Sequence, residues 1–375
     1  MIEIQIDNNK LLPNILVLGV GGGGNNAVNR MANEKTPNVT YACINTDLHV
    51  LEGINCHEKL QIGGQLTGGH GAGADPSVGQ SAAEESIDEI ENLLSGYQMV
   101  ILACGMGGGT GTGASPIIAK ISRQLKILTM AVVTLPFSFE GQPRALIAKE
   151  GLEKLEENVD TLLVLPNDKL LSLSEKKLSV KAAFDMADSI LKYTIFGITN
   201  VIYQKGTLNL DFNDLRTVLL GKGRGHLGIG TVTADGCVID AVKQAIESPL
   251  LDTTIVGATH ILLNISGDVN LSELDEAVSH IRQLSGDHTN ILWGTVGDEN
   301  TDPDKIIVTL IATGMPKNSS AGNIPPIPKR RPTLTSTVSQ NNGTVTNDDK
   351  SRPFLRQRQG NTDLKMPAFL LNHSR

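Results

Sequence analysis

The chain lacks most of the features by which secreted, membrane and metal-binding proteins are recognised. Its 375 residues include only four cysteines, and no two of them form a Cys-x-x-Cys pair. The eight histidines show no His-Glu-x-x-His spacing or similar ligand pattern, so we expect no metal site built from protein side chains. Scattered single cysteines are typical of reduced thiols in a cytoplasm rather than of a disulfide framework.

Long apolar segments and aromatic residues are also scarce. The most apolar stretch, 127–137, is too short to span a bilayer, and the acidic start of the chain has no apolar core of signal-peptide type. Aromatic residues make up 3% of the chain, so a core must be built from aliphatic side chains. We therefore expect a cytoplasmic globular protein, without direct membrane insertion, that is long enough for two domains and a tail.

The charge of −8 is distributed unevenly along the chain. Residues 316–375 hold ten Lys or Arg and three Asp or Glu, a net of +7, which leaves −15 for residues 1–315. An acidic body argues against nucleic-acid binding. The basic tail suits acidic partners or anionic lipid.

Glycine, by contrast, is abundant and gathers in three clusters. The first, at 19–24, follows the apolar run 14–18 and satisfies G-x-G-x-x-G between a predicted strand and a predicted helix. Asp47 lies 23 positions after Gly24, close to where a dinucleotide-binding fold places its ribose carboxylate. An NAD-dependent oxidoreductase is therefore one interpretation of this half of the chain.

Two further clusters favour a nucleoside triphosphate over a dinucleotide. One spans 68–75, and the other is the string 107–113, which follows the predicted strand 99–104. We expect the next helix to begin at Ser115 and Pro116. Glycine amides beside a helix N-terminus form a phosphate cradle, and the missing Gly-Lys-Ser/Thr excludes a P-loop. One pyrophosphate does not need three cradles, whereas a triphosphate with its metal can use them.

The apolar residues of 181–205 recur every three or four positions and predict one long amphipathic helix that joins two domains. Phe184 and Asp188 share a face of it. In most helices a phenylalanine such as Phe184 is a core residue and an aspartate such as Asp188 is solvated. Together, however, the two suit guanine, because the ring can stack on the base and the carboxylate can accept from two donors that adenine lacks. Glu140 and Arg144, four apart, are by themselves typical of a surface ion pair.

Asp211 and Asp214 stand three apart at a predicted helix start, where capping of the first turn is the simplest explanation. Residues 225–315 then alternate between strand-like and helix-like patterns, without features of a catalytic site. From about 316 the periodicity is lost, and we expect a disordered linker up to about 363.

Two short polar motifs accompany the string 107–113 and the two other glycine loops: Asn-Thr-Asp at 45–47 and Asn-x-Asp-Phe-x-Asp at 209–214. Together these segments resemble the tubulin/FtsZ family of GTPases, which includes bacterial cell-division proteins. The resemblance implies an α/β fold with a Rossmann-like parallel sheet. The segments it implies are an N-terminal extension (1–10), a GTP-binding domain (11–180), a central helix (181–205), a second α/β domain (206–315) with an acid loop (207–214), a linker (316–363) and a partner-binding peptide (364–375).

The same resemblance implies the site residues. Those expected to bind GTP are Gly21, Gly22, Gly23, Gly24, Asn25, Asn26, Asp47, Ala72, Gly73, Gly108, Gly109, Thr110, Gly111, Thr112, Gly113, Glu140, Arg144, Asn167, Phe184 and Asp188. Asn209, Asp211 and Asp214 are expected to act on the GTP of the neighbouring subunit. Hydrolysis then requires head-to-tail contact, which builds a filament, and Mg²⁺ is expected to bridge phosphate oxygens with few protein ligands.

The resemblance also implies partners and a place in the cell. The chain is expected to polymerise with itself at the mid-cell division site and to bind membrane-tethering and regulatory division proteins through 364–370. Lys365 and Met366 depart from the family pattern there, as does His226 in the second domain, where an apolar residue is expected. Two alternatives stay open: the NAD-dependent oxidoreductase, and a filament protein that binds nucleotide without hydrolysing it.

Overall fold

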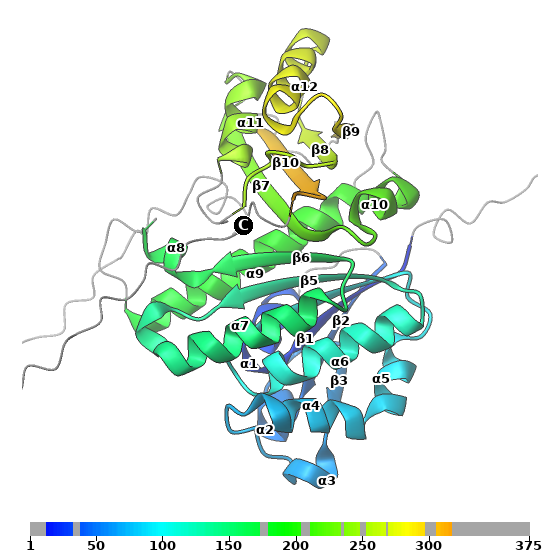
Figure 1. The fold of residues 1–375 in the computed structure, drawn as a ribbon, viewed down its shortest axis with the longest axis vertical. Helices are drawn as coiled ribbons and strands as arrows, with labels where there is room; N and C mark the ends of the chain where they lie inside the picture. The colour runs from blue at the N-terminus through cyan, green and yellow to red at the C-terminus, as the bar shows by residue number, and fades with distance from the viewer. Residues whose placement is uncertain are drawn as a thin grey trace, which may run out of the picture.

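A computed structural model describes residues 13–32, 38–172, 179–203, 211–233, 236–247, 253–267, 269–296 and 305–316 (Figure 1). Four of the predicted features lie outside these residues: the N-terminal extension, Asn209, the linker beyond residue 316 and the C-terminal peptide. No helix in the described part of the chain is long and apolar enough to cross a membrane.

The predicted parallel sheet is confirmed. Its strands are β1 (Ile15–Val20), β2 (Val39–Asn45), β3 (Glu58–Gln61), β4 (Met99–Gly105), β5 (Leu128–Leu135) and β6 (Thr161–Pro166), in the order β3-β2-β1-β4-β5-β6. Most are continuous apolar runs because helices cover both faces of the sheet. The order of the strands reverses between β1 and β4, so the loops that follow these two strands diverge and leave a crevice.

The side chains of β1 alternate between two cores. Ile15 and Val17 face α1 (Gly21–Met31) and α9 (Val180–Tyr203), whereas Leu16 and Leu18 face the opposite layer of helices. That layer consists of α4 (Pro76–Glu85), α5 (Ile87–Leu94), α6 (Thr110–Gln124) and α7 (Gln142–Glu156). Short elements lie between the strands and helices: α2 (Leu48–Glu52), α3 (Gly64–Thr67), η2 (Ser138–Glu140) and α8 (Asn167–Ser172).

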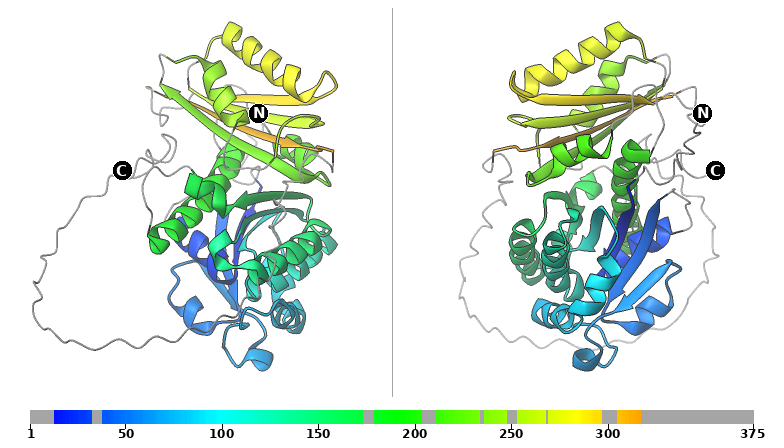
Figure 2. Two further views of the ribbon diagram at one scale, coloured as in Figure 1. Left: turned by 60° about the vertical axis from the view of Figure 1, so that its left-hand side comes forward. Right: turned by 90° about the vertical axis from the view of Figure 1, so that its right-hand side faces the viewer.

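A second sheet has the order β7-β10-β8-β9 and carries α11 (Val238–Ile246) and α12 (Leu271–Ser285) (Figure 2). Its strands are β7 (Gly223–Thr233), β8 (His260–Ser266), β9 (Asn290–Val296) and β10 (Lys305–Thr313). Glycines let α11 lie close on β7, because a Cβ at Gly228 would be 1.7 Å from the carbonyl oxygen of Ala245. The first two residues of β7 also pair with β6, which joins the two sheets.

Helix α9 lies between the two sheets, and it starts and ends close to the predicted bounds. One continuous core contains Ile195 and Ile198 of α9, residues of β1 and β4, and Leu227 and Ile311 of the second sheet. Helix α9 has 24 residues and is therefore about 36 Å long. Because this helix is packed on both sides, it fixes the positions of whatever its two ends carry.

The predicted start of the helix after the 107–113 string is wrong. Helix α6 begins at Thr110 instead of Ser115, and Pro116 lies inside it. The cause is close packing between helices: a Cβ at Gly113 would be 2.0 Å from the carbonyl oxygen of Pro76, and one at Gly79 would be 2.4 Å from that of Gly109. Part of the glycine string is therefore the first turn of a helix that lies tightly on α4.

His226, the residue that departs from the family pattern, is fully buried in β7. Its Nδ1 lies 3.0 Å from the hydroxyl oxygen of Thr253 and its Nε2 lies 3.3 Å from the carbonyl oxygen of Ala245. Burial lowers the pKa of this imidazole. Nδ1 also lies 3.1 Å from the carbonyl oxygen of Thr253, and the neutral ring, with one N–H, donates to one of the two carbonyl oxygens. These contacts join β7 to α11 and to the segment before β8.

The packing predicts that two glycines of α1 differ in their tolerance of a methyl group. At Gly24 a Cβ would be 2.0 Å from the carbonyl oxygen of Ala103 in β4, whereas at Gly22 it would meet nothing within 4 Å. We expect Gly24→Ala to lower the free energy of unfolding of the nucleotide-free protein by about 1–3 kcal/mol or more. Gly22→Ala should leave it unchanged within about 1 kcal/mol. Urea unfolding followed by circular dichroism measures both, and equal stability of the two variants would contradict the packing.

Candidate functional site

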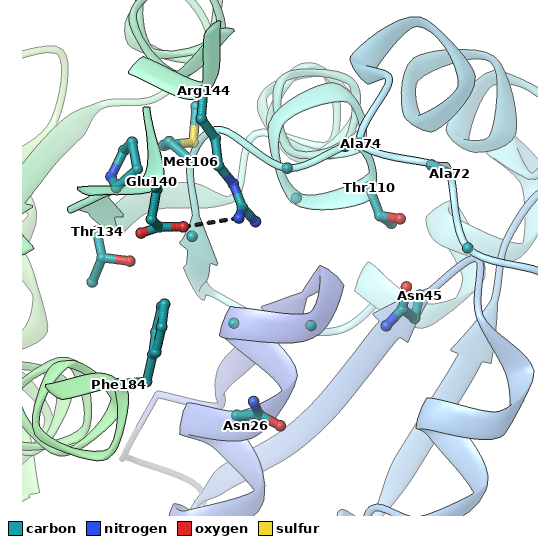
Figure 3. A pocket seen from close by; sticks show the side chains of 18 of the residues that line it. Asn26, Asn45, Ala72, Ala74, Met106, Thr110, Thr134, Glu140, Arg144 and Phe184 are labelled. Carbon is teal, nitrogen blue, oxygen red and sulfur yellow. Dashed lines mark ion pairs between the residues drawn. The ribbon is translucent and has the colours of Figure 1, made fainter. Parts of the chain in front are cut away.

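A cavity of about 490 Å³ opens at the carboxyl ends of the parallel strands (Figure 3). It lies where the strand order reverses, the position at which open parallel sheets bind ligands. Its lining comes from the ends of β2, β4 and β5, the starts of α1, α6, α8 and α9, the loop before α4, and residues of α2, η2 and α7. The lining residues are Gly22, Gly23, Asn26, Asn45, Asp47, Val50, Gly71, Ala72, Gly73, Ala74, Gly105, Met106, Gly108, Gly109, Thr110, Gly111, Thr134, Leu135, Pro136, Glu140, Arg144, Asn167, Phe184, Ala187 and Asp188.

The N-termini of two helices meet at this cavity. Gly21 begins α1 with φ +69°, and a Cβ there would be 2.6 Å from the backbone nitrogen of Gly111 in α6. Neither helix has a side-chain hydrogen bond that caps its N-terminus. Uncapped first-turn amides together with the positive ends of two helix dipoles attract an anion.

Backbone, rather than lysine, forms the anion-binding surface. An added Cβ would meet nothing within 4 Å at Gly22, Gly73 or Gly108, so the main chain at these positions faces open space. Arg144 is the one cation among the lining residues, beside the carboxylates of Asp47, Glu140 and Asp188. A phosphate chain bound here has to be held mainly by amide groups.

The Glu140–Arg144 pair lies in the cavity lining rather than on an open face (Figure 3). Nη1 of Arg144 is 2.8 Å from Oε2 of Glu140, whose side chain is only 9% exposed. Oε1 of Glu140 accepts a hydrogen bond from the backbone nitrogen of Phe137 at 2.8 Å. The carboxylate therefore anchors the guanidinium, which remains half exposed and has donors left for a ligand.

Hydrogen bonds between β2 and the glycine loops hold the far side of the cavity. Asn25 is fully buried, and its amide donates to the carbonyl oxygens of Gly19 and Ile44 at 2.8 and 3.2 Å. Its Oδ1 accepts from Asn45 at 2.8 Å. The hydroxyl oxygens of Thr46 and Thr110 lie 2.9 Å apart. Asn25 thus supports the cavity wall from behind, whereas Asn45 and Thr110 face the space.

Aromatic and polar side chains gather where α9 begins. The ring of Phe184 is 40% exposed and meets the ring of Phe137 edge-on, with centroids 5.3 Å apart. Asp188, one turn further along, has a side chain that is 15% exposed, and burial raises its pKa to about 6. Asn167, the first residue of α8, is 5% exposed, and its Oδ1 has no hydrogen-bond partner among the described residues.

An unpaired buried acceptor at a cavity wall indicates a missing donor. Leaving such an oxygen desolvated costs about 1–3 kcal/mol, and a ligand hydroxyl or N–H would offset that cost. Together with the amide-lined end, this places an anion-binding surface and a hydrogen-bonding, aromatic surface in one cavity. That combination suits a nucleotide.

Five of the predicted binding residues do not line the cavity. Gly24 and Gly113 are needed where helices pack on their neighbours, Gly21 packs against α6, and Asn25 is buried. The hydroxyl of Thr112 accepts from the backbone nitrogen of Gly107 at 2.9 Å, so it shapes the turn before α6. Lining residues that the sequence did not single out sit mostly at strand ends: Asn45, Gly105, Met106, Thr134, Leu135 and Pro136.

Asp211 and Asp214 lie elsewhere, at the start of α10 (Phe212–Leu219). Each side chain accepts a hydrogen bond from the backbone nitrogen of the other, at 2.8 and 3.1 Å, which is a capping box. Neither residue lines the cavity. They follow the C-terminal end of α9 in the chain, whereas Phe184 and Asp188 are near its start. Figure 1 shows α10 on the opposite side of the molecule from α8, whose first residue, Asn167, lines the cavity.

Comparisons with known proteins agree with this geometry. The GTPase-domain model of the Tubulin/FtsZ family matches residues 14–175, and the C-terminal-domain model of the FtsZ family matches 223–316. An empty FtsZ dimer from M. jannaschii is 39% identical, covers 81% of this chain and 89% of that chain, and has a TM-score of 0.75.

Two further solved structures extend the likeness. A tryptophan-to-tyrosine mutant of FtsZ from M. jannaschii is 38% identical over 82% of this chain and 93% of that chain, with a TM-score of 0.76. The GDP-bound monomer of CetZ1 from Haloferax volcanii is 21% identical over 81% of this chain and 94% of that chain, with a TM-score of 0.71. At 21% identity, the likeness to CetZ1 shows a shared fold.

The unpaired oxygen of Asn167 generates a prediction. Replacing this residue with leucine, which has a similar shape and no acceptor, should raise the free energy of unfolding of the nucleotide-free protein by about 1 kcal/mol. The same change should weaken GTP binding by about tenfold or more. Ser285→Ala is the matched control, because Ser285 Oγ is also buried and unpaired but lies in α12. It should gain stability and bind GTP normally, whereas full GTP affinity in Asn167→Leu would contradict the assignment.

Proposed function

The chain belongs to the FtsZ family of tubulin-like GTPases, and on that premise we propose that it hydrolyses GTP at a site completed by a second copy of itself. In this proposal the copies stack head to tail into filaments that form the cell-division ring. The active site is then shared between adjacent subunits, with GTP held by one and the acids supplied by the other.

The nucleotide is expected to lie along the cavity with its phosphates at the starts of α1 and α6. The uncapped amides there, and the open backbone at Gly73 and Gly108, suit the phosphate chain. Glu140 and Arg144 line the cavity and are expected to contact the ribose and phosphates, and Asn167 has an unpaired acceptor for the nucleoside. Phe184 supplies a ring face for the base, and Asp188 a carboxylate for the two guanine donors.

Mg²⁺ is expected to enter with the triphosphate, whose charge it neutralises. The cavity fits this role because few side chains compete for the ion: Asp47 already accepts from the backbone nitrogen of Val50 at 3.2 Å, and Glu140 is engaged by Arg144. Thr110 adds a hydroxyl at the phosphate end. The metal would therefore be held mostly by phosphate oxygens and water.

One observation carries the proposal: the acids cannot reach the cavity of their own chain. The rise from Phe184 to Tyr203 along α9 is about 28 Å, and α10 starts beyond that end. Helix α10 is also fixed, since the hydroxyls of Thr161 and Thr313 donate to the carbonyl oxygens of Leu219 and Val218 at 2.6 and 2.5 Å. Only a neighbouring copy can bring Asp211 and Asp214 to the phosphates.

Carboxylates suit this task chemically. Phosphoryl transfer depends on positioning and electrostatics more than on covalent steps, so oriented acceptors that hold and polarise the attacking water are sufficient. Asp211 is exposed and Asp214 partly exposed, so both can face a partner while keeping the helix capped. Asn209 belongs to the same proposal, although it lies outside the described residues. A contact between unlike faces that does not close into a ring extends into a filament.

The alternatives from the sequence have less support. The strand order also suits a dinucleotide, but the family match points to GTP. A filament protein without hydrolysis would not require acids, and both Asp211 and Asp214 are present at a rigid helix start. Binding of tethering and regulatory division proteins through 364–370, and a cytoplasmic location at mid-cell, complete the proposal on family grounds, since that segment lies outside the described residues.

Complementation between two inactive variants tests the shared site. Asp214→Asn keeps an amide oxygen for the cap but removes the charge, so it should fold and bind GTP yet hydrolyse almost none. Asp188→Ala should lose GTP binding but keep its acids. Mixed in equal amounts, the two should recover about one quarter of the wild-type rate of phosphate release, because that share of contacts pairs an intact cavity with intact acids.

Co-sedimentation of the mixture with GTP is the control for assembly. Mixed filaments without recovered hydrolysis would refute the division of the site between two chains.

A further inference from the structure

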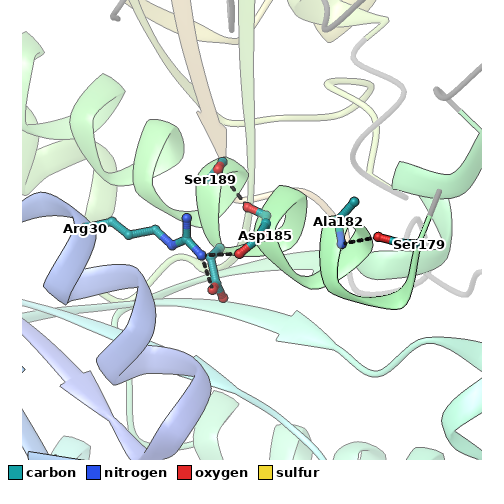
Figure 4. A network of polar contacts seen from close by, with 6 residues as sticks. Arg30, Ser179, Ala182, Asp185 and Ser189 are labelled. Atoms are coloured by element: carbon teal, nitrogen blue, oxygen red, sulfur yellow. Dashed lines mark hydrogen bonds and ion pairs between the residues drawn. The ribbon is translucent and has the colours of Figure 1, made fainter. Parts of the chain in front are cut away.

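Arg30, near the C-terminal end of α1, extends to α9 and contacts two carboxylates at once (Figure 4). Its Nη2 pairs closely with Oδ1 of Asp185 and lies 3.5 Å from Oδ2 of Asp188. Asp185 and Asp188 are three residues apart on one face of the helix. A single guanidinium therefore joins the GTP-binding cavity to a carboxylate outside it, since Asp188 lines the cavity and Asp185 does not.

The two carboxylates differ in their surroundings. The side chain of Asp188 is 15% exposed, whereas that of Asp185 is 43% exposed and that of Arg30 41%. Burial disfavours the charged form of a carboxyl group. Yet Asp188 must be charged to accept from two guanine donors at once, because a protonated carboxyl presents a donor of its own. Recognition of the base thus requires something that offsets the cost of burial.

We propose that Arg30 is a positioning residue for base recognition, holding Asp188 ionised and aimed into the cavity, while Asp185 anchors Arg30 beside it. The inference rests on the proposed function, in which Asp188 contacts guanine. Because Arg30 pairs more closely with Asp185, it stays in place without taking both oxygens of Asp188. Those oxygens remain available to the base.

The electrostatic balance agrees with this geometry. Burial is the largest influence and raises the pKa of Asp188 to about 6, the positive charge of Arg30 lowers it, and the negative charge of Asp185 raises it. As the pH rises through about 6, Asp188 therefore ionises and can accept both guanine donors. Below that pH the recognition is lost.

Other charged groups near this end of the cavity are engaged elsewhere. Glu140 and Arg144 pair with each other, and Asp168 of α8 accepts from the backbone nitrogen of Ser138 at 2.9 Å. On α9 itself, Nζ of Lys192 lies 5.3 Å from the ring centroid of Phe196. Strand β5, which α9 packs against, carries no charged residue, and Asp47 caps α2. Arg30 and Asp185 are thus the neighbours that act on Asp188.

The test compares the affinities of GTP and inosine triphosphate for the nucleotide-free full-length chain between about pH 5 and pH 8.5. Inosine triphosphate lacks the exocyclic amine but carries the same phosphates, so phosphate ionisation cancels in the ratio of the two affinities. In the wild type this ratio should rise with pH, with a midpoint set by the ionisation of Asp188, whose pKa is about 6 in the nucleotide-free chain. Asp188→Asn should give a low ratio at every pH.

The two neighbours should move the midpoint in opposite directions. Arg30→Gln removes the stabilising charge and should move the midpoint to higher pH, which lowers the ratio near pH 6 while sparing it at high pH. A midpoint that is higher by about one pH unit corresponds to a loss of up to about tenfold. Asp185→Asn removes the repelling charge and should move the midpoint to lower pH. Arg30→Lys keeps the charge and should restore much of the wild-type profile, and thermal melts of each variant control for folding.

Four results would overturn the inference. An unchanged midpoint in Arg30→Gln, or a loss of affinity that is equal at all pH values, would show that Arg30 has only a structural role. A lower midpoint in Arg30→Gln would reverse the sign of the proposed effect. A wild-type ratio in Asp188→Asn would instead show that Asp188 does not contact the base, which separates failure of the proposed function from failure of the role of Arg30.

Discussion

The stiffness and length of α9 constrain everything else in this molecule. A helix of 24 residues packed between two sheets cannot bring its ends together, and in the proposed function each end carries one part of the chemistry. Its start contributes Phe184 and Asp188 to the cavity, and α10 with its two acids follows its end. In the proposed function this separation makes hydrolysis a property of the contact between copies, so assembly and turnover are coupled by geometry.

The cavity itself depends on backbone more than on side chains. Two helix N-termini are brought together by glycines, and no lysine among the residues that the structure describes lines the space. A side chain placed among these amides would occupy the position of a ligand or collide with a neighbouring helix. The few charged side chains of the lining are engaged by fixed partners, Glu140 by Arg144 and Asp188 by Arg30. Such a preorganised cavity needs little rearrangement when an anion binds.

Much of this was predictable from sequence because strong local patterns coincided with the tertiary structure. Apolar runs predicted most of the parallel strands but not β3, the three- and four-residue spacing predicted α9, and the position of Asp211 and Asp214 predicted the cap of α10. The start of α6 was not predictable, because the packing of Gly113 on α4 decides it. Lining residues such as Thr134 and Leu135, and the contact of Arg30 with α9, depend on which strand ends and helices become neighbours, information that no short motif contains.

The central claim, that no single copy has a complete active site, is tested most directly by phosphate release per subunit as a function of protein concentration at saturating GTP. We expect the rate per subunit to be close to zero in dilute solution, where copies are separate. It should then rise with concentration to a plateau as contacts form. A rate per subunit that stays constant down to the lowest concentrations would contradict the claim, because isolated copies would then hydrolyse GTP unaided.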